Sequence, residues 1–194
     1  MNTITVKKRD PKTKAKQLRR FGIVPCVVYG GKLKESLSVQ IDQGTARQLQ
    51  RKSRNGSKVN VEFDGQIIAS LIKDLEYNSL NNEVTHISFQ ALDDDKKVNS
   101  VADIVLLNKD KVTGVLEQMQ MKVFHSALPK DLIDIVTVDL ADLPIGAVIT
   151  VGDIPAFQSS KIDLQTAADS IVLRINDKKR ADYSGNYSTD TSTF

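Results

Sequence analysis

Basic side chains crowd the first 60 residues, and the chemistry they could do is the binding of phosphate groups. Eight of them fall on one expected strand end and the helix after it: Lys7, Lys8, Arg9, Lys12, Lys14, Lys16, Arg19 and Arg20. The excess continues through Arg47, Arg51, Lys52, Arg54 and Lys58. Cations at this density can contact successive phosphates and release their counterions. A solvated helix face is the alternative for one helix, but the continuation favours nucleic-acid binding.

Residue types that perform catalysis are hard to find. The chain has two histidines, His86 and His125, and one cysteine, Cys26. The sequence has no phosphate-cradling loop, no nucleophile elbow and no metal-ligand spacing of Cys, His and carboxylates. The run Asp93-Asp94-Asp95 could hold a divalent cation, but adjacent acids in a polar connector are usually solvated. We therefore expect no enzyme activity, no cofactor and no metal.

Charge is divided unequally along the chain. Residues 1–58 hold 15 Lys or Arg against 3 Asp or Glu, whereas residues 59–194 hold 12 against 21. A field of one sign concentrated in one region steers and holds an oppositely charged partner. Since Trp is absent and aromatics are few, recognition should depend on charge and hydrogen bonds more than on stacking. Structured RNA or DNA is the partner that this pattern favours.

Nothing in the sequence indicates export or membrane insertion. The single cysteine excludes an intramolecular disulfide. The first residues lack the apolar stretch of a signal peptide, and no run of about 18 uncharged apolar residues occurs. We expect a cytoplasmic protein that does not contact membranes.

A strand followed by a helix carries the densest part of the basic segment. Residues 3–8 alternate polar and apolar side chains, as in a half-buried strand with Ile4 and Val6 on one face. Asp10 is a suitable helix N-cap before a proline, and Gly22 can end the helix. One side of this helix carries Ala15, Leu18 and Phe21, and the basic residues lie opposite.

Apolar alternation and turn signals predict further strands in this half, over residues 23–29, 37–41, 59–63, 67–73 and 84–89. Asp42 is placed to cap a second helix that reaches about Ser53. Asp64-Gly65 is a strong hairpin signal. In the last strand, the period of two predicts a core face with Thr85, Ile87 and Phe89 and a second face with Val84, His86 and Ser88.

The composition turns acidic at residues 93–95, so we place a domain boundary near residue 92. Short apolar segments beyond it predict a mostly antiparallel β domain, over residues 101–107, 119–124, 133–140, 148–151 and 170–175. The last residues lose apolar periodicity and are expected to be disordered. The expected organisation is a basic domain over 1–91, a β domain over 92–176 and a polar tail over 177–194.

A motif in the basic half resembles a known family. Residues 19–30 are Arg-Arg-Phe-Gly-Ile-Val-Pro-Cys-Val-Val-Tyr-Gly, with Arg and Gly before an apolar run that contains Pro and ends in Tyr-Gly. The segments Leu71-Ile72-Lys73-Asp74-Leu75 and His86-Ile87-Ser88-Phe89 match two further strands of the same family. On these motifs the chain resembles the bacterial ribosomal protein L-25 family, also known as general stress protein Ctc, which binds 5S rRNA.

The second half is similar to the extra β domain of the family's long form, through Gly114-Val115-Leu116-Glu117, Val138-Asp139-Leu140 and Leu143-Pro144-Ile145-Gly146. The resemblance implies a mainly β protein with a few short helices. Its N-terminal domain would be a small β-barrel similar to the anticodon-binding barrels of glutaminyl-tRNA synthetase, and a second antiparallel β domain would follow. The barrel would dock on an internal loop of 5S rRNA, whose distorted grooves are recognised by shape.

Carried over position by position, the family's RNA-contacting residues fall on Arg9, Arg20, Tyr29 and His86. The arginines would hold phosphates, Tyr29 would donate its hydroxyl, and His86 would contact RNA from the polar face of its strand. Neighbouring residues complete the expected RNA-binding set: Lys14, Lys16, Arg19 and Ser88.

Three positions depart from the family pattern. Ser88 replaces an Asp, so the site lacks an acceptor-only anion that orients His86 or reads a base amino group. Glu76 replaces a Gln and places a negative charge near the expected RNA face. Ala147 replaces an acid in the second domain. These changes bear on affinity and ribosome residence more than on the fold.

The resemblance implies a structural protein of the large ribosomal subunit that binds 5S rRNA on cytoplasmic ribosomes, as a monomer. Its second domain would be a spacer or would contact neighbouring large-subunit ribosomal proteins. Three alternatives stay open. They are a stress-associated paralogue with weakened or conditional 5S rRNA binding, a nucleic-acid-modifying enzyme that docks through the barrel, and an interaction module whose acidic half binds a basic protein.

Overall fold

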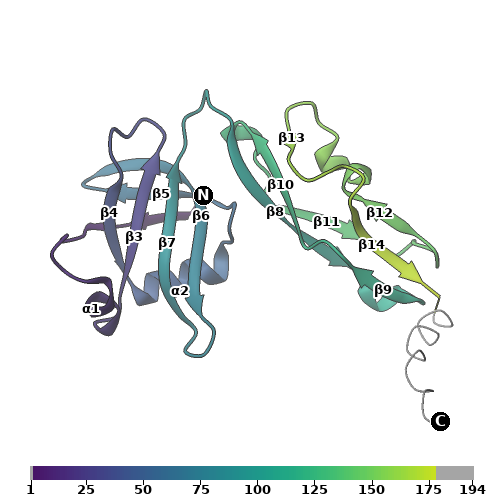
Figure 1. Ribbon diagram of the computed structural model, residues 1–194, viewed down its shortest axis with the longest axis horizontal. Coiled ribbons are helices and arrows are strands. Elements are labelled where there is room, and N and C mark those ends of the chain that lie inside the picture. The colour runs from purple at the N-terminus through teal and green to yellow at the C-terminus, as the bar shows by residue number, and fades with distance from the viewer. Residues whose placement is uncertain (1, 178–194) are drawn as a thin grey trace, which may run out of the picture. The chain divides into compact units, whose positions relative to one another are not determined.

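The computed structural model describes residues 2–177, which form a mainly β protein with two short α-helices (Figure 1). The expected mainly β architecture is confirmed. The chain divides into two compact units. The first holds the residues up to Ala102 with Ser126–Asp134, and the second holds Asp103–His125 with the residues from Ile135 onward. The tail predicted to be disordered, 177–194, lies outside the described residues except for its first residue.

A curled seven-stranded sheet dominates the first unit, in the order β1-β5-β6-β7-β3-β4-β2. Its strands are β1 Asn2–Thr5, β2 Lys7–Lys8, β3 Ile23–Gly30, β4 Leu37–Asp42, β5 Lys58–Phe63, β6 Gln66–Asn78 and β7 Glu83–Ala91. β1 and β2 follow each other in sequence, yet they form opposite edges of the sheet. The N-terminal segment therefore joins both edges and curls the sheet into a half-barrel.

The N-terminal segment is hydrogen-bonded to different strands before and after Val6. β1 runs parallel to β5, whereas β2 runs antiparallel to β4. The Val6 N–H donates to the Glu62 carbonyl at 2.9 Å, and the Arg9 N–H donates to the Ser38 carbonyl at 3.0 Å. The single strand predicted over residues 3–8 is thus two short strands, because the chain changes its hydrogen-bond partner at Val6.

The interior of the half-barrel is apolar. Ile4 and Val6 point into it, as predicted, and are 6% and 4% exposed. They pack with residues of α2 and of the other strands, among them Val24, Val28, Val39, Leu49, Val59, Val61, Ile72, Ile87 and Phe89. Cys26 belongs to the same cluster, and its burial raises the pKa of the thiol to about 12. The one cysteine is therefore an inert core residue at neutral pH.

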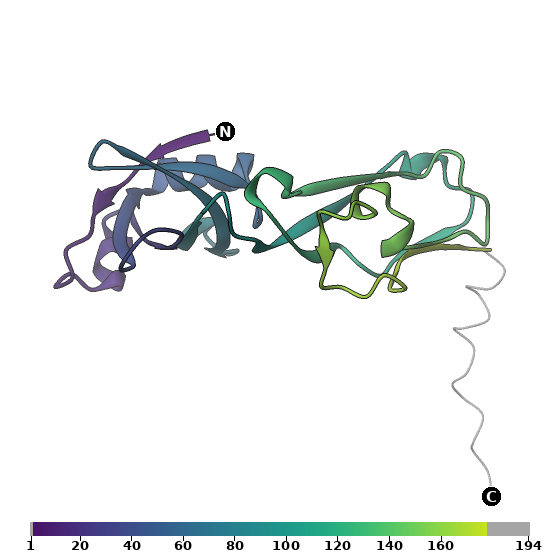
Figure 2. The same ribbon diagram turned by 90° about the horizontal axis from the view of Figure 1, so that it is seen from above.

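The second predicted helix is present as α2, Gln43–Lys52, and Figure 2 shows it beside the N-terminal strand. Asp42 caps it by accepting from the Thr45 N–H at 2.9 Å and from the Thr45 hydroxyl at 2.6 Å. These hydrogen bonds lower the pKa of the Asp42 carboxyl. The predicted hairpin is also confirmed, since Asp64 and Gly65 both adopt the positive φ that a tight turn between β5 and β6 requires.

The first helix is shorter than predicted. α1 covers Ala15–Arg20 only, because Asp10 caps a preceding turn through the Lys12 N–H and the Thr13 hydroxyl instead of capping the helix. At the other end the helix stops before Phe21, which is 73% exposed rather than packed beside Leu18. Gly22, with φ of +69°, ends the helix as predicted.

The predicted faces of β7 need one correction. Val84 was expected on the polar face with His86, but it is 2% exposed. His86 pairs with Glu76 and Val84 pairs with Tyr77, which leaves Thr85 as an extra residue. Such a β-bulge shifts the inside-outside alternation by one residue. Val84 therefore points inward although strict alternation places it outside.

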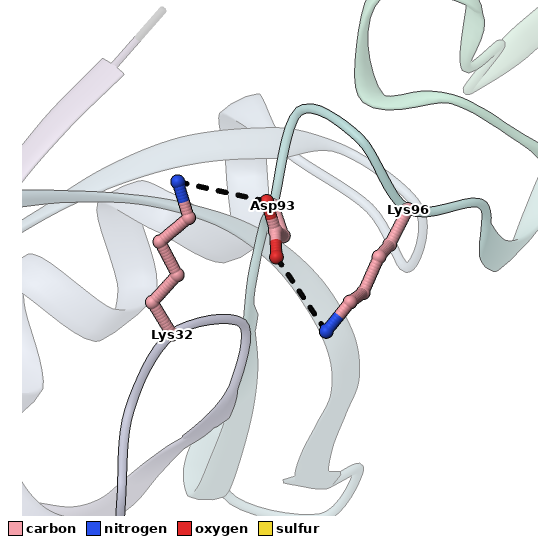
Figure 3. A network of polar contacts seen from close by, with 3 residues as sticks. All are labelled: Lys32, Asp93 and Lys96. Carbon is pink, nitrogen blue, oxygen red and sulfur yellow. Dashed lines mark ion pairs between the residues drawn. The ribbon is translucent and has the colours of Figure 1, made fainter.

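Asp93 is not solvated, although the run Asp93-Asp94-Asp95 predicts a solvated acid. Its side chain is only 9% exposed, and its carboxylate lies between two ammonium groups, 3.8 Å from Lys32 and 3.7 Å from Lys96 (Figure 3). The Lys96 N–H also donates to the Asp93 carbonyl at 3.1 Å. These contacts tie the loop after β3 to the turn after β7.

The rest of the chain forms two smaller sheets. One has four strands in the order β11-β8-β10-β13, and the other has three in the order β12-β14-β9. Their bounds are β8 Val98–Leu107, β9 Val115–Gln118, β10 Lys122–Ala127, β11 Ile135–Asp139, β12 Val148–Thr150, β13 Asp163–Leu164 and β14 Ile171–Asn176. Four 3-10 turns connect strands of these described residues: Lys109–Lys111, Pro129–Asp131, Val151–Asp153 and Pro155–Phe157.

Strand direction varies between these sheets. β14 pairs antiparallel with both β12 and β9, whereas β11 runs parallel to β8. Side-chain alternation does not distinguish the two directions, so the pattern of the sequence does not reveal the parallel pair. The strand predicted over 119–124 begins later than expected, because β9 ends at Gln118 and β10 begins only at Lys122.

Because the N-terminal segment packs into the half-barrel, substitutions at neighbouring residues of β1 should differ widely in their effect on the free energy of unfolding. Ile4→Ala should lower the free energy of unfolding by about 2–5 kcal/mol, because it leaves a cavity in the interior. Thr3→Ala changes an exposed side chain of the same strand and should cost at most about 0.5 kcal/mol. Urea denaturation followed by circular dichroism measures both. Equal losses would contradict the inward role of Ile4.

His125 predicts a pH dependence of stability. The ring is 0% exposed, its centroid lies 6.0 Å from that of Phe157, and burial lowers the pKa of the imidazole from its usual 6.5. His125 therefore binds a proton more readily in the unfolded chain than in the folded chain. The free energy of unfolding should fall as pH drops below about 6.5. Urea midpoints between pH 8 and pH 5 measure this slope in the wild-type chain and in His125→Phe. A slope unchanged in His125→Phe, in a variant that folds, would contradict the assignment.

Candidate nucleic-acid interface

The outer side of the half-barrel carries a row of polar residues. In the strand register, Val27 of β3 pairs with Ser88 of β7, and Ser88 pairs with Asp74 of β6. Val27 also pairs with Ser38 of β4, whose carbonyl accepts from the Arg9 N–H. Residues paired across strands lie on the same face of a sheet. Arg9, Ser88 and Asp74 therefore share one row on the outside.

Two neighbouring rows of the same side carry the other expected strand residues. His86 lies two residues before Ser88 and pairs with Glu76. Tyr29 pairs with Gln90, two residues after Ser88. We call the surface that holds the side chains of Arg9, Tyr29, His86 and Ser88 the outer face. All four are half-buried, so each presents part of its side chain to solvent.

Short-range contacts orient the side chains of the outer face. The Ser88 hydroxyl lies 3.5 Å from His86 Nδ1, at the limit of a hydrogen bond. Burial, with a smaller contribution from the negative charge of Asp74, raises the pKa of the Tyr29 hydroxyl. Tyr29 therefore keeps its proton at neutral pH and remains a hydrogen-bond donor.

Arg9 is partly committed to the protein itself. Its Nη2 donates to the Thr13 carbonyl at 3.0 Å and so holds the turn that precedes α1. Its Nε is buried without a hydrogen-bond partner among the described residues. A buried donor left unsatisfied is costly, so the guanidinium still has a donor that an added acceptor could satisfy.

α1 packs on the same side of the unit. It contacts β3, and Leu18 is buried without belonging to the interior cluster. Arg19 Nε donates at 2.9 Å to the carbonyl of Thr85, the bulge residue beside His86. The bulge thus supplies the acceptor that holds α1 next to the outer face.

The other basic residues of the expected set surround this helix. Lys16 and Arg20 are four residues apart and therefore project from one side of α1, away from Leu18. Lys14 stands at the N-cap, and all three are exposed. The structure thus brings the strand residues onto one face and places the helix cations beside it. Arg19 differs from them, because part of its guanidinium binds the protein backbone.

Sequence reasoning missed the position of Asp74. Strict alternation from the inward Ile72 places Asp74 inside, but Lys73 is a second bulge residue, which turns Asp74 outward to pair with Ser88. The expected negative charge of Glu76 is on the same side, opposite His86. The outer face therefore combines cations at its margin with two carboxylates on β6.

No group of three or more His, Cys, Asp or Glu side chains in residues 2–177 is arranged to hold a metal ion. Within the same range, no helix is long and apolar enough to cross a membrane.

Comparison with known proteins relates both halves of the chain to ribosomal proteins. Residues 4–89 match the model of the ribosomal L25p family, and residues 97–179 match that of the C-terminal domain of ribosomal protein TL5. Large ribosomal subunit protein bL25 of Dictyoglomus turgidum is 30% identical over 89% of this chain and 87% of its own length. The protein of the same name from Exiguobacterium sibiricum is 31% identical over 86% of this chain and 77% of its own length.

Proposed function

The chain belongs to the ribosomal L25p family in its two-domain form, and we propose that it binds 5S rRNA in the large ribosomal subunit through the outer face. The family consists of structural ribosomal proteins, and we infer that this chain likewise has no enzyme activity. Membership also implies a cytoplasmic, ribosome-associated location.

One observation supports this proposal above all others, namely that the strand register gathers Arg9, Tyr29, His86 and Ser88 on one side. Hydroxyl, imidazole and guanidinium groups can together contact riboses, bases and phosphates. A sheet surface suits the wide, shallow minor groove of an A-form helix. The outer face would therefore read the shape of an internal RNA loop rather than the sequence of a duplex.

The cations of α1 would attract the negatively charged RNA backbone. Lys14, Lys16 and Arg20 are exposed and would contact phosphates beside the outer face. Arg19 acts differently, because its hydrogen bond to Thr85 fixes the helix in place. The basic helix is thus already positioned in the free protein, which reduces the entropy lost on binding.

Two carboxylates favour a second candidate, a stress-associated paralogue with weaker or conditional 5S rRNA binding. Asp74 and Glu76 lie on the same side as the outer face, paired with Ser88 and His86. Carboxylates near phosphates oppose binding unless they accept from a base amino group or are screened by salt. The two candidates differ in affinity and share the same surface.

We also propose a domain boundary near residue 92. The two family models support it, since one match ends at residue 89 and the other begins at residue 97. The second domain would contact neighbouring large-subunit ribosomal proteins, with the chain acting as a monomer in the ribosome.

Salt-dependent binding tests the proposed function. Purified 5S rRNA should bind more tightly than an unrelated RNA duplex at physiological salt, and the logarithm of its affinity should fall linearly with the logarithm of salt concentration. A weak but detectable preference for 5S rRNA would support the conditional paralogue, and equal affinity for both RNAs would reject the proposal. RNase treatment before co-purification tests the protein-binding alternative, because an association bridged by RNA should disappear.

Arg20→Ala should weaken 5S rRNA binding by about 1–3 kcal/mol, the range expected for a lost charge-assisted contact. Electrophoretic mobility shifts at fixed salt measure the change. Lys122→Ala, which removes an exposed cation of β10, is the matched control and should bind as wild type. Wild-type affinity in Arg20→Ala would contradict the role of α1.

Ser88→Asp should strengthen 5S rRNA binding. The added carboxylate would lie two residues from His86 on the outer face, where it can orient the imidazole or accept from a base amino group. Ser79→Asp adds the same charge to the exposed β6–β7 loop and should not strengthen binding. The same binding assay measures both, and no gain in Ser88→Asp would mean that the surface is adapted to serine.

A further inference from the structure

Three large apolar side chains remain in solvent at one end of the first unit. Phe21 is 73% exposed, Tyr77 is 54% exposed and Leu80 is 94% exposed. They lie at the end of α1 and on the β6–β7 hairpin, both at the lower end of this unit in Figure 1. Ile67, on the separate β5–β6 hairpin, is the other strongly exposed large apolar residue among those described in this unit. Exposed apolar residues that gather in one region indicate a contact surface.

Hydrogen bonds connect the two aromatic residues. Gly22, next to Phe21, accepts through its carbonyl from the Gln43 N–H at 2.8 Å. With its amide oriented to satisfy both partners, the Gln43 side chain donates to the Val84 carbonyl and accepts from the Val84 N–H. Val84 is the cross-strand partner of Tyr77. Phe21 and Tyr77 thus stand on opposite sides of one short, hydrogen-bonded link.

Three arginines and two carboxylates lie near this link, the carboxylates being Glu83 and Glu76, the residue before Tyr77. Arg20 precedes Phe21, and Arg19 is bonded to Thr85, the residue after Val84. Arg47 lies 3.9 Å from Glu83 at the base of the hairpin. Exposed aromatic rings near arginines suit a partner that is negatively charged and has flat apolar faces. Unpaired nucleotides have both properties.

We propose that Phe21 and Tyr77 stack on unpaired RNA bases at this end of the first unit. This inference rests on the proposed RNA-binding function and adds a class of ligand, the unstacked base. Both side chains are attached to ordered backbone, since the Phe21 N–H donates to the Leu18 carbonyl at 2.9 Å and Tyr77 lies within β6. The backbone that carries these rings therefore needs little ordering when a base stacks on them.

The test uses the full chain and two RNA probes, a fully paired hairpin and the same hairpin with an internal loop of unpaired bases. Phe21→Leu and Tyr77→Leu keep apolar area and remove the aromatic ring. Each should weaken binding of the looped hairpin about 5- to 150-fold and leave binding of the paired hairpin unchanged. Ile67→Ala alters a comparably exposed residue away from this end and should bind both RNAs as wild type. Fluorescence anisotropy measures all affinities, and circular dichroism confirms that each variant is folded.

Three results would overturn the inference, and they differ in what they say of the proposed function. If both leucine variants bind the looped hairpin as wild type does, stacking is wrong while RNA binding stands. If they weaken binding of both hairpins equally, the rings contribute contact without selecting unpaired bases. If the wild-type chain binds neither RNA, the proposed function fails together with the stacking.

Discussion

The fold of the first unit depends on the backbone pairing of its N-terminal segment with two different strands. An open sheet has two edges with unpaired N–H and C=O groups, which are sites of aggregation in natural proteins. Here Asn2–Thr5 pairs with β5 at one edge and Lys7–Lys8 pairs with β4 at the other. The same segment sends Ile4 and Val6 into the interior and leads directly to Arg9. The pairing that curls the sheet therefore also places Arg9, the first candidate RNA-binding residue.

Irregular residues in the strands determine the composition of the outer face. The bulge at Thr85 provides a carbonyl for Arg19, and the bulge at Lys73 turns Asp74 toward Ser88. Regular strands would leave α1 without this anchor and would send Asp74 inward. Bulges commonly redirect side chains near functional sites, and in this unit they set both the position of the cations and the presence of a carboxylate. The balance of charge on this face is thus decided by backbone geometry as well as by composition.

Local signals in the sequence predicted the elements that local chemistry controls. Asp42 as the cap of α2 and Asp64-Gly65 as a tight turn both depend on interactions within a few residues, and both are confirmed. Features set by distant partners were not predictable in this way. Val84 was turned inward by a bulge in its pairing with β6, and Asp93 was buried against Lys32 of the loop after β3. The shared face of His86 and Ser88 was predicted from alternation, whereas the inclusion of Tyr29 and Arg9 required the pairing of β3 with β7 and of β2 with β4.

The order of strands also constrains how the chain folds during its own synthesis. β1 and β2 emerge first, but their partners β5 and β4 end at residues 63 and 42, and β3 pairs with β7, which ends at residue 91. Pairings between such distant segments form late, because loop closure costs entropy before the contacts repay it. A nascent chain shorter than the whole first unit holds its apolar strands without partners. We therefore expect the sheet of this unit to form only after β7 has left the ribosome. The interval between synthesis and pairing is then long for the N-terminal segment.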